Sequence, residues 1–335
     1  MGDRAEAGMS ISPAPLSRGA NYSPYKGELC REDVAVSTRS GAPSVCARRP
    51  AARGSEWRYT AAVHTRSVLA EGLGVTVSDF VCRARVHPEG AEEANEQPSI
   101  VFLRRGAFRR TQRGARVLAC ANHVLFFHPD SPYRIAHPHV GGDECTIFTL
   151  SPRLAERRPK PFLAGHGPCS PRLARLHFEV LTQAAEPALA WEDALAALLD
   201  EALGVPLPAR AAPSRHRDLT EGAKSALQAR ITAAPRLAEL ARSLGVSPFH
   251  LSRTFARVEG IPLRRYFLRL RLRDAAVRLT QGESDLSALA LELGFFDHSH
   301  FTNAFRREWG VGPRAFRERA RTSKQLRPVS DTPAE

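Results

Sequence analysis

The fold is decided by the stretch ARSLGVSPFHLSRTFARVEG (residues 241–260) and by its near-copy ALELGFFDHSHFTNAFRREWG (residues 290–310). Ala241 matches Ala290 and Gly245 matches Gly294, and the second copy then carries one extra residue. The later matches are Leu251 with Phe301, Phe255 with Phe305, Gly260 with Gly310 and Tyr266 with Phe316. A repeat of this length indicates one supersecondary unit built twice. Its pattern is that of a helix-turn-helix, so we expect two helices that read DNA.

The small residues of both copies suit a tight turn between two crossing helices. Gly245 and Gly294 lie where the turn needs a positive φ, which glycine adopts without steric cost. Ala241 and Ala290 lie one helical turn earlier, where a larger side chain would push the crossing helix away. We therefore expect a short helix, a turn and a second helix in each copy.

Capping residues mark the start of each second helix. Ser247 precedes Pro248, which places an N-cap before a proline at the first helical position, and Asp297 can cap the second copy in the same way. The i,i+4 pairs Leu251/Phe255 and Phe301/Phe305 should anchor these helices to their cores. Ordinary helix hairpins are the alternative interpretation, but two copies at matching offsets in a basic segment favour the DNA-reading one.

The charge of the chain suits a polyanionic partner. The 335 residues carry a formal net charge of +13 and have a pI near 10.2. Residues 221–319 hold 17 Lys or Arg against 10 Asp or Glu, which is consistent with double-stranded DNA as a partner. A surplus of arginine is also common in proteins from GC-rich genomes, so charge alone decides little. The sequence has no apolar stretch that could span a bilayer and no signal-peptide core, so we expect a cytoplasmic protein without a membrane partner.

The cysteines do not form a recognisable metal or disulfide pattern. They are scattered without CxxC pairs, which argues against a zinc site and against a disulfide framework. We expect reduced thiols, no bound metal and no cofactor. The six residues are Cys30, Cys46, Cys82, Cys120, Cys145 and Cys169.

The chain divides into segments of different composition, and we expect an α+β protein. Residues 1–55 lack periodicity and are expected to be disordered. Residues 57–155 should form a small antiparallel β-barrel, because short alternating strands are punctuated by Gly and Pro. Residues 170–204 have helical periodicity and 205–218 form a linker. Residues 219–320 should be all helical, and 321–335 a disordered tail.

Several strands of the expected barrel can be placed. Residues 80–86 alternate between apolar and polar side chains, and Arg113-Gly114 suits a hairpin turn. Two short apolar runs, at 124–127 and 145–150, suit buried strands. In the helical segment that follows, one stripe (Leu173, Leu176, Val180, Leu181) and a second (Leu195, Leu198, Leu199, Leu203) are either a dimerisation surface or a face buried within the domain.

Residues 225–318 resemble the DNA-binding domain of the AraC/XylS family of bacterial transcription regulators. The resemblance includes GIPLRRYFLRLRLRDAAVRL (260–279) and is most specific over LGFFDHSHFTNAFRREWGVGPRAFR (293–317). The stretches IVFLRRGAF (100–108) and VLFFHPDSPYRIAHPHVGGDE (124–144) are similar to the cupin-like sensor domain of some members.

The resemblance implies two helix-turn-helix units joined by a long helix, here from Pro262 to about Thr280. Leu263, Tyr266, Phe267 and Leu270 fall on one face of this helix. We expect its arginines to face outward, either toward phosphates or simply toward solvent. They are Arg264, Arg265, Arg269, Arg271, Arg273 and Arg278.

The residues expected to contact DNA lie at the starts of the two second helices. Arg253 is the first choice, because a guanidinium can bridge O6 and N7 of guanine, and Asn303 could pair with adenine. Phe249 could press on a thymine methyl, whereas Arg306 and Arg307 suit phosphates. The full candidate set is Phe249, His250, Ser252, Arg253 and Arg257 in the first unit, and His298, Ser299, Thr302, Asn303 and Arg306 in the second.

We expect a transcription regulator, not an enzyme, in which an unknown small-molecule effector binds the barrel and changes how the DNA-binding domain is held. RNA polymerase is an expected partner, and a homodimer a further one.

Two enzyme classes and a redox sensor are alternatives. A metal-dependent cupin is suggested by His87, His123, His128, His137 and His139, although the His137-Pro138-His139 pair lies in a Pro-rich loop. Alkyl-DNA repair proteins need a four-cysteine zinc site, and Cys30 and Cys46 lack that spacing. A redox-sensing regulator using Cys82, Cys120 or Cys145 stays open, beside their simpler role as small buried residues.

Overall fold

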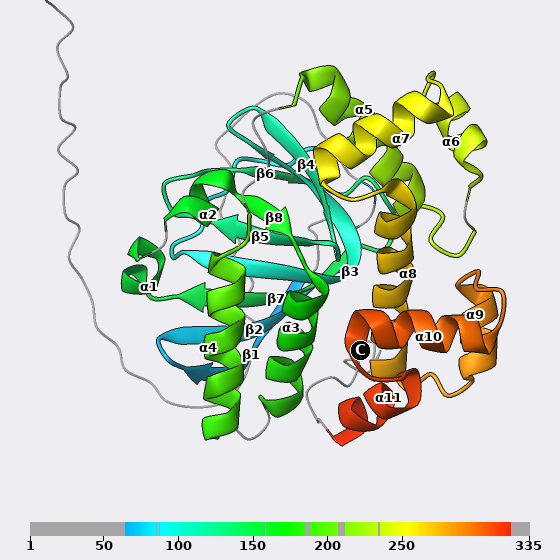
Figure 1. Ribbon diagram of the computed structural model, residues 1–335. Helices are drawn as coiled ribbons and strands as arrows, with labels where there is room; N and C mark the ends of the chain where they lie inside the picture. The colour runs from blue at the N-terminus through cyan, green and yellow to red at the C-terminus, as the bar shows by residue number, and fades with distance from the viewer. Residues whose placement is uncertain are drawn as a thin grey trace, which may run out of the picture. The chain divides into compact units, whose positions relative to one another are not determined.

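The computed structural model describes residues 64–84, 86, 88–157, 159–184, 188–206, 212–233 and 235–322 (Figure 1). All of them belong to one compact unit, Ala52–Glu335. A sheet comes first along the chain and helices follow, in agreement with the expected α+β class. The segment 1–55, expected to be disordered, lies outside the described residues, as does 323–335 of the tail expected over 321–335, whereas Arg321 and Thr322 belong to the last helix.

The N-terminal half is an antiparallel sheet. Its strands are β1 (His64–Gly72), β2 (Val75–Cys82), β3 (Ser99–Gln112), β4 (Ala115–Cys120), β5 (His123–Phe127), β6 (Arg134–Ala136), β7 (Asp143–Leu150) and β8 (His166–Pro168). They follow the order β1-β2-β7-β3-β5-β8, with β4 and β6 also paired to β3. Among these strands no pairing joins β1 to β8, so the sheet does not close into the expected barrel.

The long strand β3 changes its partners along its length. Its first residues pair with β5 and β7, whereas its last residues, from Ala107 onward, pair with β4 and β6. The register shifts between Leu103 and Arg105, and Gly106 has a φ of +77°. The strand therefore bends from one set of partners to another. The expected turn at Arg113-Gly114 is present between β3 and β4, and both of its residues have a positive φ, as in a two-residue hairpin.

Helices cover one face of the sheet. α1 (Pro152–Glu156) and α2 (Lys160–Ala164) are short, and α3 (Pro171–Gln183) and α4 (Leu189–Leu203) pack side by side (Figure 1). The apolar faces of α3 and α4 share one core with Phe102 and Phe148 of the sheet. They contribute Leu173, Val180, Leu195 and Leu198. The two apolar stripes are thus largely core, which favours the second of the two alternatives, a face buried within the domain.

The C-terminal half is helical. It contains α5 (Ser214–Gln228), α6 (Leu237–Ser243), α7 (Pro248–Glu259), α8 (Leu263–Thr280), α9 (Leu286–Glu292), α10 (His298–Trp309) and α11 (Pro313–Thr322). α5 begins inside the range 205–218 that we expected to be a linker. Among the described residues, no helix combines the length and the apolar composition that a membrane span requires.

The helix α8 is enclosed on nearly every side. One core cluster joins its first residues to α5, α6 and α7, and a second joins its later residues to α9, α10 and α11. Arg264 and Arg265 are exposed as expected, but Arg271 and Arg273 are only 9% and 6% exposed, which corrects the outward orientation that we expected for them.

The two buried arginines bind backbone carbonyls. Arg271 donates to the carbonyls of Ile231 (3.1 Å) and Gly294 (3.2 Å), and Arg273 donates to those of Ala121 and Cys169. A buried guanidinium needs such acceptors because it keeps its charge. Arg271 therefore connects the segment after α5 to the turn of the second unit, and Arg273 connects α8 to the sheet half.

A buried histidine predicts a loss of stability in acid. His177 of α3 stacks on Phe102 with 4.5 Å between ring centroids, and its Nε2 atom has no hydrogen-bond partner in the described part of the chain. Burial, followed by the charges of Arg104 and Arg273, lowers the pKa of His177 to about 3. The unfolded chain then binds a proton below about pH 6.5 that the folded chain does not, so the free energy of unfolding decreases as the pH falls from 6.5 toward 3.

We expect His177→Leu to remove part of this decrease. Between pH 6.5 and pH 5 the variant should lose about 2 kcal/mol less unfolding free energy than the wild type, measured by urea denaturation. His250→Leu, at an exposed position on α7, is the control and should follow the wild type. Equal pH slopes for His177→Leu and the wild type would contradict this account.

The turn glycines give a second prediction. A Cβ at Gly294 (φ +72°) would lie 2.6 Å from Nη2 of Arg271, whereas one at Gly245 (φ +69°) meets nothing within 4 Å. Gly245→Ala should lower the unfolding free energy by about 1–2 kcal/mol through backbone strain alone. Gly294→Ala should lower it by about 1 kcal/mol more, because Arg271 must leave its acceptors. Urea denaturation of both variants tests this, and equal losses would show that the Arg271 contact does not matter.

Candidate nucleic-acid interface

The first helix-turn-helix consists of α6, a turn at Gly245 and α7. Ala241 is fully buried where the helices cross, and Leu251 and Phe255 of α7 are fully buried in the core. The Ser247 hydroxyl accepts a hydrogen bond from the backbone N–H of His250 at 3.2 Å. The expected turn, cap and anchors are thus confirmed, and they leave the first turn of α7 facing solvent.

The second unit repeats this construction with α9, a turn at Gly294 and α10. The Asp297 carboxylate accepts from the backbone N–H of His300 at 2.6 Å, and Phe301 and Phe305 are fully buried. Both reading helices have 12 residues, and each ends at a glycine with a positive φ, +73° at Gly260 and +76° at Gly310. The repeat in the sequence is therefore a repeat in structure.

The candidate DNA contacts all lie on these two helices. In α7, Phe249 is 74% exposed, His250, Arg253 and Arg257 are exposed, and Ser252 is half-buried. In α10, the exposed candidates are His298, Ser299, Asn303 and Arg306, and Thr302 is half-buried. The structure thus collects the ten residues into two sets, one at each reading helix.

One exposed position was missed by the sequence analysis. His300 occupies the place in α10 that His250 occupies in α7, because each backbone N–H binds its own N-cap side chain. Its ring packs against Phe295 with 5.4 Å between centroids. Alignment of the two copies from their N-caps would have revealed it.

A hollow of about 380 Å³ lies beside α10. Its wall includes Arg265 and Arg269 of α8, Asn303 and Arg307 of α10, and the buried Glu308. Asn303 and Arg307 therefore border a concave basic surface.

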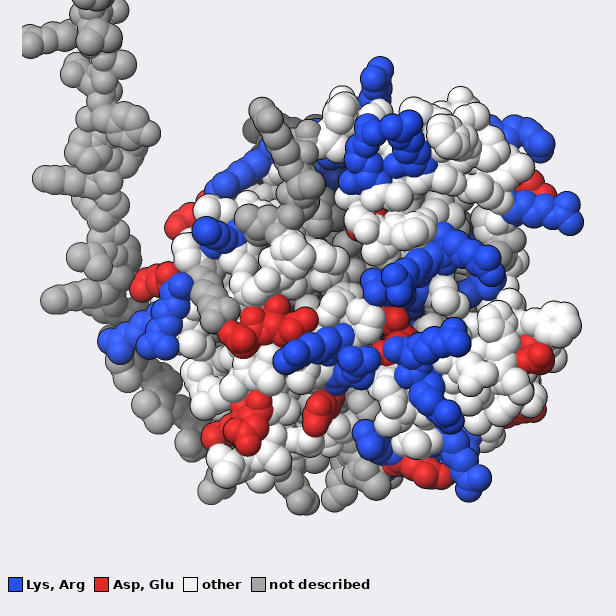
Figure 2. All heavy atoms as spheres, in the orientation of Figure 1, with Lys and Arg blue, Asp and Glu red and all other residues white. Residues whose placement is uncertain are grey.

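Basic side chains gather around the reading helices. On the face drawn in Figure 2, Lys and Arg concentrate where Figure 1 places α7, α8 and α10, whereas Asp and Glu are more frequent toward the sheet half. The exposed arginines of these three helices are Arg253, Arg257, Arg264, Arg265, Arg306 and Arg307. Such a surface attracts a phosphate backbone.

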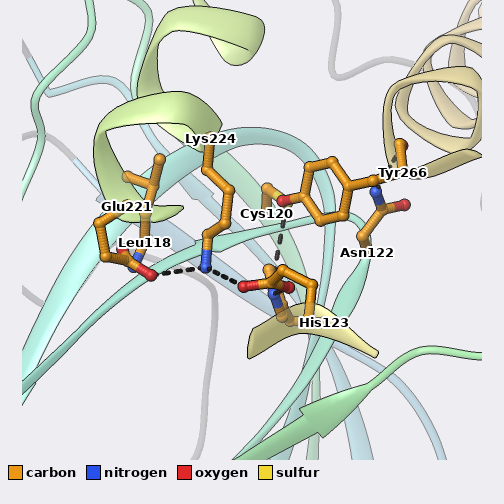
Figure 3. Close-up of polar contacts among 8 residues, drawn as sticks. Leu118, Cys120, Asn122, His123, Glu221, Lys224 and Tyr266 are labelled. Atoms are coloured by element: carbon orange, nitrogen blue, oxygen red, sulfur yellow. Dashed lines mark hydrogen bonds and ion pairs between the residues drawn. The ribbon is translucent and has the colours of Figure 1, made fainter. Parts of the chain in front are cut away.

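A buried polar cluster joins this interface to the sheet (Figure 3). We call it the junction cluster, and it consists of Cys120, His123, Glu221, Lys224, Glu259 and Tyr266. Lys224 of α5 donates to Glu221 (2.7 Å) and to Glu259 at the end of α7 (3.2 Å). Glu259 in turn faces His123 of β5 at 3.3 Å.

Further bonds attach the sheet to α5 and α8. The backbone N–H of Leu118 donates to Glu221, and Asn122 donates to the backbone carbonyl of Tyr266 at 2.9 Å. The Cys120 thiol lies 3.0 Å from the Tyr266 hydroxyl. Strands β4 and β5 therefore contact the two helices that hold α7.

The charges of the junction cluster stabilise one another. Burial opposes ionisation of Glu259, but the charge of Lys224 and the hydrogen bond from His123 outweigh it and hold the pKa of Glu259 well below its usual range. Burial lowers the pKa of His123, and the neighbouring Cys120 and Glu259 overcome this and raise it to about 9. Burial raises the pKa of the Cys120 thiol, but His123 and Tyr266 outweigh burial and lower it.

The histidines that suggested a metal-dependent cupin do not converge. His123 belongs to the junction cluster, His128 faces Asp130 at 3.5 Å, and His139 lies 3.3 Å from Ser225 of α5. His137 is paired with Asp143 at 2.7 Å. His87 lies outside the described residues. His137 and His139 thus have different partners, which does not favour the alternative of a metal-dependent cupin.

Comparisons with known proteins concern mainly the C-terminal half. Residues 240–319 match the family model of a helix-turn-helix domain. The regulatory protein PocR of Salmonella typhimurium is 27% identical over 106 residues, which are 32% of this chain and 35% of PocR. The probable transcription factor PqrA of Proteus vulgaris is 33% identical over 79 residues, which are 24% of this chain and 65% of PqrA.

One solved structure is similar to part of this chain. The transcriptional regulator with an AraC-type DNA-binding domain from Chromobacterium violaceum has 27% identity and a TM-score of 0.31, and the match covers 32% of this chain and 96% of that one. The chain spans less than two thirds of the length of the curated relatives given above. The matched family model and the structure agree that residues 240–319 of this chain form a helix-turn-helix domain, and this part of the chain is similar to known regulators of transcription.

Proposed function

We propose that this chain is a sequence-specific DNA-binding regulator of transcription that reads two consecutive major grooves with α7 and α10. The observation that carries the proposal is the pair of 12-residue helices, each with a capped and exposed first turn and a buried opposite face. An exposed N-terminal turn of a recognition helix is the part that reaches base edges. The similarity to curated regulators supports the same function.

The length of α8 suits two neighbouring grooves. Its 18 residues span about 27 Å at about 1.5 Å per residue. The major groove faces one side of B-DNA about every 34 Å, so the length of α8 is of the same order as the spacing of neighbouring grooves. Because α8 is enclosed by core on both units, it acts as a rigid spacer, and one chain can engage both grooves without a dimer.

Each candidate side chain has a definite task on this proposal. Arg253 pairs with guanine through O6 and N7, Asn303 pairs with adenine through N6 and N7, and Phe249 contacts a thymine methyl. Ser252, Thr302 and Ser299 offer hydroxyl groups to bases or phosphates, and His250 and His298 lie beside them. Arg257 and Arg306, one turn further along their helices, bind phosphates.

We also propose that the sheet half makes the regulator responsive to an effector. The junction cluster supports this, because it connects β4 and β5 to α5, α7 and α8 through buried hydrogen bonds. An effector that changes the position of these strands would act on the helices that hold α7. The size of this effect is limited by the difference between the effector's affinities for the two conformations of the protein. RNA polymerase and a second copy of this chain are the proposed protein partners.

Base reading by both units predicts two separate changes in sequence preference. Arg253→Ala should make the binding free energy for the selected site less favourable by about 1–3 kcal/mol and relax the preference at one base pair. Asn303→Ala should relax it at a position about one helical turn of DNA, or about 10 base pairs, away. Selection of sites from a random DNA pool with each variant, followed by fluorescence anisotropy, measures both effects.

The matched control is Arg153→Ala, which removes an exposed arginine from α1 in the sheet half. This variant should keep the wild-type preference and affinity. If Arg253→Ala and Asn303→Ala relaxed neighbouring base pairs, the two helices would not occupy consecutive grooves. If either weakened random and selected DNA equally, base reading by that residue would be excluded.

Phosphate binding predicts a different response for Arg306. The wild-type affinity should decrease steeply with salt, because bound cations are released from DNA on binding. Arg306→Ala should reduce the slope of log K against log salt by about 1 and weaken selected and random DNA alike. Anisotropy titrations over a range of KCl concentrations test this, with Arg153→Ala as the control. A flat salt response of the wild type would contradict DNA binding through this basic surface.

A further inference from the structure

A cluster of metal-ligating side chains is buried where the ends of three strands meet. Cys82 is the last residue of β2, Asp143 is the first residue of β7 and pairs with Cys82 in the antiparallel register, and His137 follows β6. One ligand atom from each of the three lies within 4.8 Å of the other two. The side chains belong to residues that are 6%, 4% and 5% exposed, respectively.

A second thiol borders this group. Cys145 is two residues beyond Asp143 on the same strand, so both side chains project from the same face of the sheet. The Cys145 thiol donates to Oδ2 of Asp143 at 3.0 Å, and Nε2 of His137 lies 2.7 Å from Oδ1 of the same carboxylate. Asp143 thus stands between an imidazole and a thiol, with Cys82 beside it.

The backbone is shaped to bring these residues together. Gly142 and Gly106 both have a positive φ, and a Cβ on Gly142 would lie 1.8 Å from the carbonyl oxygen of Cys82. A Cβ on Gly106 would lie 2.1 Å from the carbonyl oxygen of Gly142. Only glycine at both positions permits the segment before β7 to press against the end of β2.

We propose that Cys82, His137, Asp143 and Cys145 form a binding site for one thiophilic divalent cation of the zinc class. Two thiolates, one imidazole and one carboxylate are four ligands of the types that Zn²⁺ uses in tetrahedral sites. Thiolates select Zn²⁺ over Mg²⁺ and Ca²⁺, which prefer oxygen ligands. Four protein ligands fill the coordination of a tetrahedral ion, as in structural zinc sites.

The same loop reaches the DNA-binding half. His139, two residues after His137, lies 3.3 Å from Ser225 of α5, and Gln228 of α5 donates to the carbonyl of Gly106 at 3.4 Å. α5 packs against α7 in one core. Occupation of the site by a metal ion fixes His137 and thereby the loop that contacts α5. This second part, that the ion alters DNA binding, rests on the proposed function.

The test of metal binding uses the untagged full chain, reduced and freed of metal with a chelator, and Co²⁺ as the spectroscopic probe. We expect one Co²⁺ per chain, with the near-ultraviolet thiolate-to-metal band and the visible bands of a tetrahedral ion, and displacement by Zn²⁺. Cys82→Ser and Cys145→Ser should each weaken the thiolate band and lower the affinity at least about 10-fold. Cys169→Ser, a buried thiol outside the cluster, and the double variant Cys30→Ser/Cys46→Ser are controls that should match the wild type.

If a variant fails to fold, a measurement on the wild type still tests the site. Zn²⁺ should slow the alkylation of Cys82 and Cys145, read by mass spectrometry, and leave Cys169 unchanged. Absence of Co²⁺ uptake by the wild type, or equal uptake by Cys82→Ser, would overturn the site.

The regulatory part is tested by DNA affinity with and without Zn²⁺, and we expect a change of about 5–150-fold in the wild type and none in Cys145→Ser. Metal binding without any DNA binding would overturn the proposed function but not the site. DNA binding that is identical with and without Zn²⁺ would overturn the coupling alone.

Discussion

The arrangement of the helical half depends on the burial of α8, and that burial depends on two guanidinium groups finding carbonyl acceptors. Arg271 and Arg273 cannot lose their charge, so an enclosed α8 is tolerable only where backbone oxygens approach them. Arg271 takes its acceptors from the segment after α5 and from the second turn. Arg273 takes its acceptors from the β4–β5 turn and from the residue after β8. Through these four carbonyls, α8 is hydrogen-bonded to the segment after α5, to the second helix-turn-helix unit and to the sheet half.

The two units are alike in the chain but differ in their neighbours. The first contacts the sheet through the junction cluster, with charged groups from α5, α7 and β5 bound to one another. The second contacts α3, where Phe178 stacks on Phe316 at 3.9 Å and Arg175 donates to the carbonyl of Glu308 at 2.9 Å. A movement of β4 and β5 would therefore reach α7 through polar bonds, whereas a movement of α3 would reach α10 through aromatic packing.

The loop before β7 places a third contact between the halves. It carries His137 toward Cys82 and Asp143, and His139 toward Ser225 of α5. The two histidines of the His137-Pro138-His139 sequence thus contact two different parts of the protein. A ligand that fixes one of them changes the constraint on the other, because a proline alone separates them and leaves little freedom of the backbone between them.

The sequence by itself determined the helices α7 and α10, because caps, turn glycines and i,i+4 anchors act between residues close along the chain. It placed the turns at Gly245 and Gly294, the caps Ser247 and Asp297, and the exposed starts of α7 and α10 correctly. Only the tertiary structure decided that the sheet stays open under α3 and α4, that Arg271 and Arg273 lie inside, and that Cys82, His137, Asp143 and Cys145 meet. Which side chains are buried, and which come together from distant parts of the chain, is decided by how distant segments pack. The periodicity of one segment does not indicate which segments will pack against it.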